Sequence, residues 1–412
     1  MPVIDESLAK DIPPGTEILR TKIWEPYSIY KKFIGAGKGE KINTGFLTEK
    51  KKPGVAEKLS VWLRGNLFIP DARCYWIKPS VKYLSNYLQN NKVDAIVSTG
   101  PPHSMHLIAM QLSKKFNIPW VADFRDPWTN IDYYKDLMLT TLADAKHHRL
   151  EREVVTSASR VVVVGKTMQE EFERDFNRKV DVITNGYDTE DIQSNSESLN
   201  FPKSPTANWQ LPTADSSNTF QANEKFIISH VGTLVRSRNP FKLWSSIAAL
   251  TKTNPAFANQ LQIRLTGKVD IAVRNSLREL GLEKIVTYIE YLPHDQVIRE
   301  QQQASVLLLV LNNTQNAKGI LTGKMFEYLA ARRPILCIGP PDGDAAEIIT
   351  ETQSGTTISF DDQNKMDSNI SSLYEKFKSG TLNVNSINVE KYARKSLTGE
   401  MVKVLDGAVA GH

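Results

Sequence analysis

Short apolar runs alternate with helical segments along most of the chain, and this alternation constrains the fold more than any other feature. The stretch 318–347 shows it compactly: a helix is expected over 324–331, a buried strand over 335–338 and a second helix from Asp344. A continuous apolar run such as Ile335-Leu336-Cys337-Ile338 is typical of a strand covered on both faces of a parallel sheet. The pattern predicts an α/β chain, and its 412 residues favour more than one domain.

The alternation divides into two halves. The segment 189–224 is rich in Ser, Asn, Thr and Pro and has little periodicity, so we interpret it as a linker. The predicted organisation is an N-terminal domain over 1–188, the linker over 189–224, a C-terminal domain over 225–387 and a terminal helix within 388–412. Strands are predicted at 93–98, 119–124, 161–164, 180–183, 226–231, 261–266, 285–290, 305–311, 335–338 and 356–360. One long helix is expected over 132–157, with His147 and His148 on its surface.

The first part of the chain departs from this pattern. Its first strand candidate is Glu17–Ile23, and the segment 31–58 that follows is rich in lysine and glycine. Aromatic side chains, among them Phe33, Phe46 and Trp62, interleave with or follow the lysines. Two interpretations stay open: a solvated surface loop, or a patch that contacts an anionic membrane.

Composition limits the class of protein. Hydrophobic residues make up 41% and charged residues 24%, which is ordinary for a globular chain, and the net charge of +5 is too diffuse to predict nucleic-acid binding. The two cysteines, Cys74 and Cys337, exclude a disulfide framework and lack metal-ligand spacing. The strongest apolar run, Val306–Leu311, is too short to cross a bilayer. These features predict a cytoplasmic protein, with a peripheral position at the inner face of the membrane as the alternative.

The stretch 318–347 also carries candidate binding residues. Thr322 stands at the N-cap position of the helix, and free amides at such a helix end attract anions. Lys324 lies in the first turn, where its charge opposes the helix dipole unless a phosphate lies nearby. Glu327, one turn further, is placed to accept hydrogen bonds from a ribose diol. The alternative is a surface Lys–Glu pair without a binding role.

Here a resemblance to a known family enters. The segment KMFEYLAARRPIL followed by GDAAEII resembles the nucleotide-sugar segment of GT-B glycosyltransferases of family 4. The resemblance implies that Glu327 holds the ribose and that Thr322 and Gly323 offer backbone amides to the diphosphate. In the family another glutamate lies eight positions earlier, but this sequence has Gly319 there, which leaves open which groups hold the sugar.

Other segments extend the resemblance. HVGTLVRSRNP is similar to the first loop of the family's C-terminal domain, which implies that Arg238, and then Arg236, grips the donor diphosphate. Lys268 and Leu292 fall in loops that approach the nucleotide in that family.

The N-terminal half carries its own matches. STGPPHSMHL and PWVADFRDPW resemble segments of bacterial members, and their loops follow successive strands at one sheet edge. We therefore expect His103, Arg125 and Asp126 to be catalytic residues. Distant members have a histidine near the position of Arg125, so His103 would be only a spatial substitute for it. A buried Arg–Asp pair that holds the loops together is the alternative.

The resemblance implies a GT-B fold, two Rossmann-like domains facing across a cleft, with the first N-terminal βα unit missing from this chain. It also implies that the C-terminal helix within 388–412 crosses back and braces the N-terminal domain. It implies transfer of a sugar, with retention, from a nucleotide-diphosphate sugar to a saccharide or lipid-linked acceptor, in cell-surface polysaccharide or glycolipid synthesis. No metal and no other cofactor is expected. Two alternatives stay open: an inactive fragment that only binds nucleotide, and an isomerase like the UDP-sugar 2-epimerases.

Overall fold

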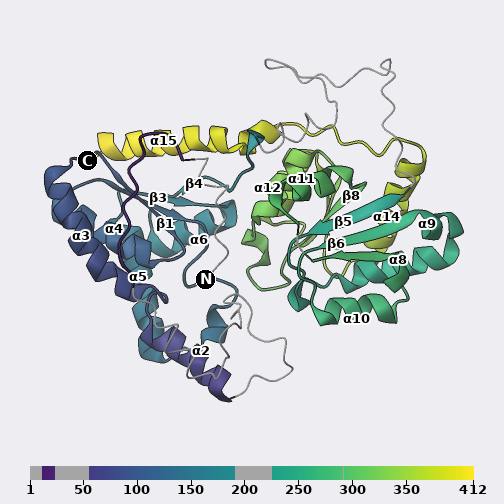
Figure 1. The fold of residues 1–412 in the computed structure, drawn as a ribbon, viewed down its shortest axis with the longest axis horizontal. Helices are drawn as coiled ribbons and strands as arrows, with labels where there is room; N and C mark the ends of the chain where they lie inside the picture. Colours follow the sequence, from purple (N-terminus) through teal and green to yellow (C-terminus); the bar gives the residue numbers. More distant parts are fainter. Residues whose placement is uncertain (1–11, 24–54, 191–224, 291) are drawn as a thin grey trace.

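The computed structural model describes residues 12–23, 55–190, 225–290 and 292–412. Within these ranges the chain forms two parallel sheets, each covered by helices, that lie side by side (Figure 1). The predicted segment 31–58 lies outside the described residues as far as residue 54.

The first sheet has the strand order β1-β2-β3-β4 in the described part of the chain. Its strands are β1 (Ile96–Gly100), β2 (Trp120–Phe124), β3 (Arg160–Val163) and β4 (Asp181–Val182). The associated helices are α2 (Val55–Leu67), α3 (Ile77–Asn90), α4 (Ser104–Phe116), α5 (Thr141–Ser157) and α6 (Lys166–Phe176), with 3-10 turns η2 (Cys74–Trp76) and η3 (Tyr134–Leu137). Every residue of β2 is buried, including Asp123, so this strand lies in the interior of the sheet.

The second sheet has the order β10-β9-β8-β5-β6-β7. Its strands are β5 (Phe226–Val231), β6 (Leu261–Thr266), β7 (Val286–Ile289), β8 (Val306–Val310), β9 (Ile335–Ile338) and β10 (Gly355–Ile358). Its helices are α8 (Phe241–Thr253), α9 (Pro255–Gln260), α10 (Ile271–Glu279), α11 (His294–Gln303), α12 (Gly323–Ala331), α13 (Asp344–Glu351) and α14 (Gln363–Lys378), with 3-10 turns η5 (Arg236–Arg238), η6 (Glu283–Ile285) and η7 (Ala317–Gly319). The strand order reverses between β5 and β8, and open α/β sheets bind ligands at such a switch point.

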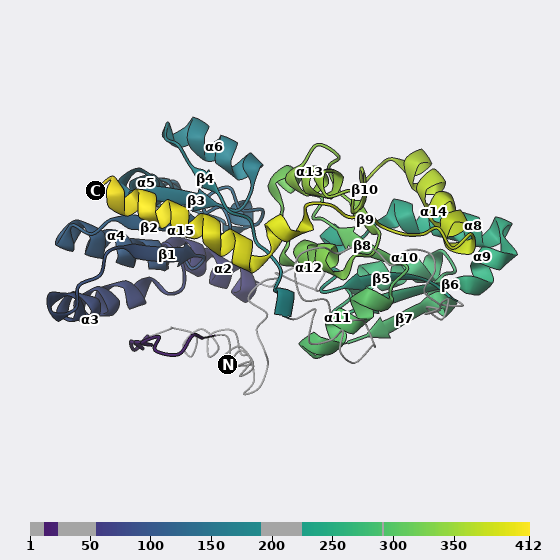
Figure 2. The same cartoon turned by 90° about the horizontal axis from the view of Figure 1, so that it is seen from above.

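The last helix returns to the first sheet. After η8 (Val389–Tyr392), α15 (Arg394–Ala410) lies along the first sheet in both views (Figures 1 and 2). Its Val404 and Ala408 pack against Val121 and Val162 of that sheet. The two chain segments that cross between the sheets also pair, because Tyr187 forms a parallel bridge with Ala393. The C-terminal segment therefore closes the molecule back onto its first half.

Three sequence predictions are wrong in this first half. Glu17–Ile23 is not a strand: it lies against α3, where Tyr87 donates a hydrogen bond to Glu17 and Trp76 donates one to Thr21. The expected helix over 132–157 begins only at Thr141, because Thr140 caps it through its side chain. His147 is buried rather than on the surface, since its Nδ1 accepts a hydrogen bond from the Trp128 indole.

The core of the first half contains histidines that must stay neutral. Ser98 Oγ accepts a hydrogen bond from the Trp120 indole, so its own proton goes to Nδ1 of His106, 2.8 Å away. Burial lowers the pKa of His106 from the ordinary 6.5 to about 3. In the centre of the second sheet, burial is also the main reason why the pKa of His230 is lowered from 6.5 to about 3. Neither imidazole takes up a proton in the folded state until the pH is far below the value at which it does so in the unfolded chain.

We therefore expect stability to fall as the pH drops below about 6.5. Between pH 7.5 and pH 5.5, His106 and His230 become protonated in the unfolded chain but stay neutral in the native protein. Each histidine therefore lowers the free energy of unfolding by about 1.4 kcal/mol over this range. In His106→Gln, this pH-driven loss should shrink by about 1.4 kcal/mol. The measurement is the free energy of unfolding in urea at both pH values. The exposed His148→Gln is the control, and an unchanged loss in His106→Gln would contradict the assignment.

Candidate functional site

The loops at the switch point of the second sheet form the centre of the site. Gly232 ends β5 and Gly267 ends β6, and both adopt positive φ angles, +115° and +108°. A Cβ placed on Gly232 would lie 2.5 Å from the Lys324 Nζ. The positive φ favours glycine at position 232, and the short distance shows that the lysine at the start of α12 reaches the loop after β5.

The N-terminus of α12 opens at this place. Thr322 is the N-cap residue, as the sequence predicted, but its side chain makes no cap hydrogen bond. Its Oγ1 is buried without a hydrogen-bond partner among the described residues. In that part of the chain no hydrogen bond occupies the backbone N–H of Gly323 or Lys324 either. The helix end thus presents free donors where an anion is favoured.

Two cations share this space. Burial, followed by the nearby Arg238, lowers the pKa of Lys324 from 10.5 to about 8, and Glu327 opposes the shift. Burial also lowers the pKa of Arg238. Within the described ranges, no carboxylate forms an ion pair with either side chain. Two partly buried and mutually repelling cations beside free amides make a site that a polyanion stabilises.

The remaining predicted donor residues lie around this centre. Arg236 belongs to the same turn as Arg238 but is exposed. Lys268 is exposed in the loop after β6, and its backbone carbonyl accepts a hydrogen bond from Leu234. Leu292 is partly exposed between β7 and α11. The structure thus places Thr322, Gly323 and Lys324 together at the start of α12, with Arg238 near Lys324. Arg236, Lys268 and Leu292 are more peripheral.

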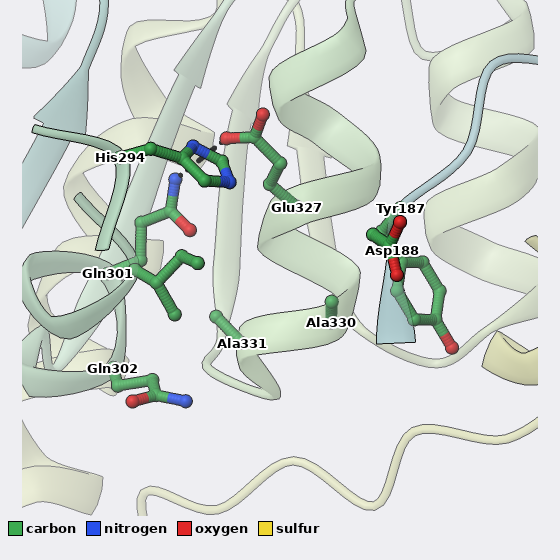
Figure 3. A pocket seen from close by; sticks show the side chains of 9 residues that line it. Tyr187, Asp188, His294, Gln301, Gln302, Glu327, Ala330 and Ala331 are labelled. Atoms are coloured by element: carbon green, nitrogen blue, oxygen red, sulfur yellow. Dashed lines mark hydrogen bonds between the residues drawn. The ribbon is translucent and has the colours of Figure 1, made fainter. Parts of the chain in front are cut away.

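Glu327 faces a groove between α11 and α12. Its carboxylate accepts a hydrogen bond of 3.0 Å from Gln301 Nε2 on α11 (Figure 3). The groove encloses about 310 Å³, including the part open to solvent. Its lining is Tyr187, Asp188, His294, Ile298, Gln301, Gln302, Glu327, Ala330 and Ala331. The carboxylate and Lys324 therefore stand one turn apart, with the cation at the switch point and the anion at the groove.

The position of the missing glutamate lies at the contact between the two sheets' domains. A Cβ on Gly319 would lie 3.3 Å from the side chain of Thr167, the second residue of α6. Asp344, the first residue of α13, accepts hydrogen bonds from the Thr167 backbone N–H and hydroxyl at 3.1 and 2.6 Å. A larger residue at 319 would disturb this contact, which gives a physical reason for the glycine.

On the N-terminal side, Arg125 is held by the protein itself. Its Nε donates to Asp123 at 2.8 Å, and its NH1 donates to the carbonyls of Ile183 and Thr184. This is the Arg–Asp pair that the sequence left open as an alternative, with Asp123 as the partner. The guanidinium ties the end of β2 to the segment that leaves the domain.

His103 and Asp126 differ in their surroundings. His103 is buried and stacks on Trp128 with ring centroids 4.6 Å apart, and burial holds its pKa well below the ordinary value. It is therefore a neutral imidazole. Asp126 is exposed to solvent at its surface, but the atoms around its carboxyl group still exclude part of the water. This partial desolvation, followed by the neighbouring Asp132 carboxylate, raises the pKa of Asp126. Among the described residues, no ion pair or hydrogen bond engages the Asp126 side chain.

Sequence reasoning missed the residue that connects the two sides. Asn312, directly after β8, accepts a hydrogen bond of 2.7 Å from Arg238 Nε and donates one of 2.8 Å to Asp132 of the N-terminal domain. Lys135 and Gln315 form a second contact across the same boundary, at 2.7 Å. The signal was available in part, since Asn312 follows the strand at which the order reverses, but its partners come from distant segments.

Part of the chain is similar in sequence to a known family. Residues 45–191 match the sequence model of a family described as Glycosyltransferase Family 4. No curated protein sequence matches the chain significantly.

Several solved structures share the arrangement. Sucrose-phosphate synthase from Thermosynechococcus elongatus superposes with a TM-score of 0.56 at 15% identity, covering 82% of this chain and 79% of the other. An α,α-trehalose 6-phosphate synthase from Burkholderia multivorans superposes with a TM-score of 0.53 at 10% identity, covering 82% of this chain and 75% of the other. TarM from S. aureus, in a complex with UDP, superposes with a TM-score of 0.50 at 14% identity, covering 81% of this chain and 59% of the other.

These similarities define the class of fold. The chain has the GT-B fold of glycosyltransferases, as the sequence resemblance predicted. Its N-terminal domain matches family 4 within that class.

Proposed function

We propose that this chain is a glycosyltransferase that takes a sugar from a nucleoside-diphosphate sugar and transfers it to an acceptor hydroxyl. The observation that carries the proposal is the pair of partly buried cations, Lys324 and Arg238, which lack a carboxylate ion pair in the described chain and stand beside the free amides of α12. A diphosphate supplies the negative charge that this site lacks. The UDP in the TarM complex and the family 4 match support the same class of donor.

The geometry indicates how the reaction would be assisted. The bond between the sugar C1 and the diphosphate oxygen breaks, and a bond from C1 to the acceptor oxygen forms. The acceptor oxygen bonds to C1 on the same face from which the diphosphate departs, which gives retention. The acceptor proton passes to the departing diphosphate oxygen. Lys324, Arg238 and the α12 amides stabilise the charge that develops on the leaving group. Asp126 and the neutral His103 orient the acceptor from the N-terminal side, while Arg125 holds their loop in place. No metal or further cofactor enters this scheme.

The test is calorimetric titration with UDP, GDP and their sugars, alongside a thermal melt. We expect saturable binding of one nucleotide and a higher melting temperature in its presence. A folded chain that binds none of them would overturn the proposal. Incubation of the preferred donor with saccharide and glycolipid acceptors should then yield a product with retained configuration. Turnover of the donor without an acceptor would instead favour an epimerase-like isomerase, and binding without any turnover would favour a fragment that only binds nucleotide.

We also propose that the N-terminal domain contacts an anionic membrane, as a glycolipid acceptor would require. None of the helices in the described part of the chain combines the length and apolar character needed to span a bilayer. Instead α2, at the periphery of the N-terminal domain, exposes the apolar residues Leu59, Trp62 and Leu67 next to Lys58 and Arg64 (Figure 1). Apolar and basic side chains exposed together favour an anionic lipid surface.

This surface gives a direct prediction. The chain should cosediment with vesicles of phosphatidylglycerol and phosphatidylcholine but not with phosphatidylcholine alone, because the basic residues add attraction to the apolar contact. The double substitution Leu59→Asp and Trp62→Asp should reduce the bound fraction at least about fivefold, since both contacts are lost. Val402→Asp, an exposed position on α15, is the matched control. Equal sedimentation of the double variant and the control would contradict a docking role for α2.

A further inference from the structure

Gln301 is a buried polar residue, and within the described chain its side chain makes its hydrogen bond to the carboxylate in the groove. It is 1% exposed and lies in the last turns of α11. Its Nε2 donates a hydrogen bond of 3.0 Å to Oε2 of Glu327. Within the described chain, this is the one hydrogen bond that the Glu327 carboxylate accepts from another residue. A buried amide directed at one oxygen of a carboxylate in a groove calls for a reason beyond packing.

The helix that carries Gln301 is fixed to the sheet by its neighbour. Glu300 is buried, accepts a hydrogen bond of 3.1 Å from Ser229 of β5, and forms an ion pair of 3.2 Å with Arg264 of β6. These two contacts prevent α11 from sliding or rotating on the sheet. The side-chain amide of Gln301 is therefore held in one position relative to α12. Through its hydrogen bond it restricts the side-chain conformation of Glu327.

Figure 3 shows the consequence for the groove. Gln301 approaches Glu327 from the side of α11, and the carboxylate lies at the end of the groove that His294 also borders. One carboxylate oxygen, Oε2, is occupied by the amide, and Oε1 stays available. A neutral donor orients the carboxylate without cancelling its charge, whereas a lysine or arginine at position 301 would neutralise it.

We propose that Gln301 is a positioning residue that holds Glu327 in the orientation needed to accept hydrogen bonds from the ribose hydroxyls of the donor. This role rests on the proposed function. It also defines the donor class: a site built to bind a sugar hydroxyl rejects an analogue that lacks it, because its buried polar groups are then left unpaired. The chain therefore selects ribonucleoside diphosphate sugars over 2′-deoxyribonucleoside diphosphate sugars.

The experiment compares Gln301→Met, which keeps the side-chain length and removes the donor, with the wild-type chain. Calorimetry measures the Kd for UDP and GDP and for their 2′-deoxy forms. We expect the wild-type chain to bind the ribonucleotide about tenfold or more tightly than its 2′-deoxy form. Gln301→Met should weaken ribonucleotide binding about tenfold and change 2′-deoxynucleotide binding less than about twofold. Gln303→Met, an exposed glutamine outside the groove on the same helix, is the matched control.

A double variant separates an indirect role from a direct one. If Gln301 acts through Glu327, Gln301→Met in the Glu327→Ala background should weaken binding less than about twofold further. Equal losses for ribose and deoxyribose, or additive losses in the double variant, would overturn the positioning role while leaving the proposed function intact. A wild-type chain that binds no nucleotide would overturn both.

Discussion

Replacing Glu327 by alanine is expected to weaken binding of the donor nucleotide about 10- to 100-fold without unfolding the C-terminal domain. A hydrogen bond between a hydroxyl and a buried carboxylate contributes about 1.5–3 kcal/mol, and this change removes the acceptor. The fold should tolerate it, because Glu327 borders an open groove and its hydrogen bond within the described chain is the one to Gln301.

The measurement is the Kd for UDP or GDP by calorimetry, with the thermal melt of the same samples. Glu375→Ala is a suitable control, since Glu375 is an exposed helical glutamate on α14, far along the chain from the groove. The control should bind as tightly as the wild-type chain. Unchanged affinity in Glu327→Ala would remove the assignment of the groove as the ribose site.

Lys324→Met is expected to weaken diphosphate binding about 100-fold, because a partly buried ammonium at the end of α12 is lost from the anion site. The same substitution should leave the free protein as stable as before, or more stable. Burial already disfavours the Lys324 charge, which has no carboxylate ion pair within the described residues, so removing it relieves the repulsion with Arg238. Weaker binding together with undiminished stability is the signature of a residue kept for its ligand.

The pKa of Lys324 adds a second readout. Since the free protein holds this pKa at about 8, the cationic form that binds diphosphate is depleted as the pH rises above that value. Affinity should therefore be highest below pH 8 and fall by up to about tenfold per pH unit above it. Phosphate titrates near pH 6, so its protonation does not contribute between pH 7.5 and pH 9.5.

Two variants complete the pH experiment. Lys324→Arg should keep measurable affinity with a flat pH profile, because its guanidinium stays charged over this range. Lys324→Met should be weak and equally flat. A wild-type profile that is flat over the same range, or a falling profile that persists in Lys324→Met, would show that another group controls the pH dependence.

The elements that the sequence predicted best are those with a strong local signal. The segments predicted as strands at 226–231, 261–266 and 335–338 are β5, β6 and β9. The run 335–338 is unbroken and apolar, as a strand buried on both faces requires, while β6 alternates apolar and polar residues. The start of α12 was equally clear. Predictions failed where the local signal was weak: Glu17–Ile23 has strand-like residues but pairs with no strand, and the helix after residue 132 depends on the cap at Thr140.

The candidate site divides in the same way. Lys324, Glu327 and Arg238 were predicted as donor-binding residues because each lies in a short segment whose residues resemble a known family, and this needs no three-dimensional information. Gln301 and Asn312 were missed, although each contacts one of these residues directly. Nothing in the sequence around a buried glutamine on a polar helix, or an asparagine in a loop, shows which distant side chain it will meet.

By itself, then, the sequence determined the alternation of strands and helices and the presence of two halves, since these depend on local pattern and residue type. It also supplied the charged residues of the candidate site, Lys324, Glu327 and Arg238. Only the tertiary structure decided that the strand order reverses between β5 and β8, and that Asn312 joins Arg238 to Asp132 across the two domains. The reason is physical: a hydrogen bond at 2.7 or 2.8 Å between residues 74 or 180 positions apart depends on how whole elements pack. That packing is fixed by the burial of all the apolar faces together rather than by any one segment.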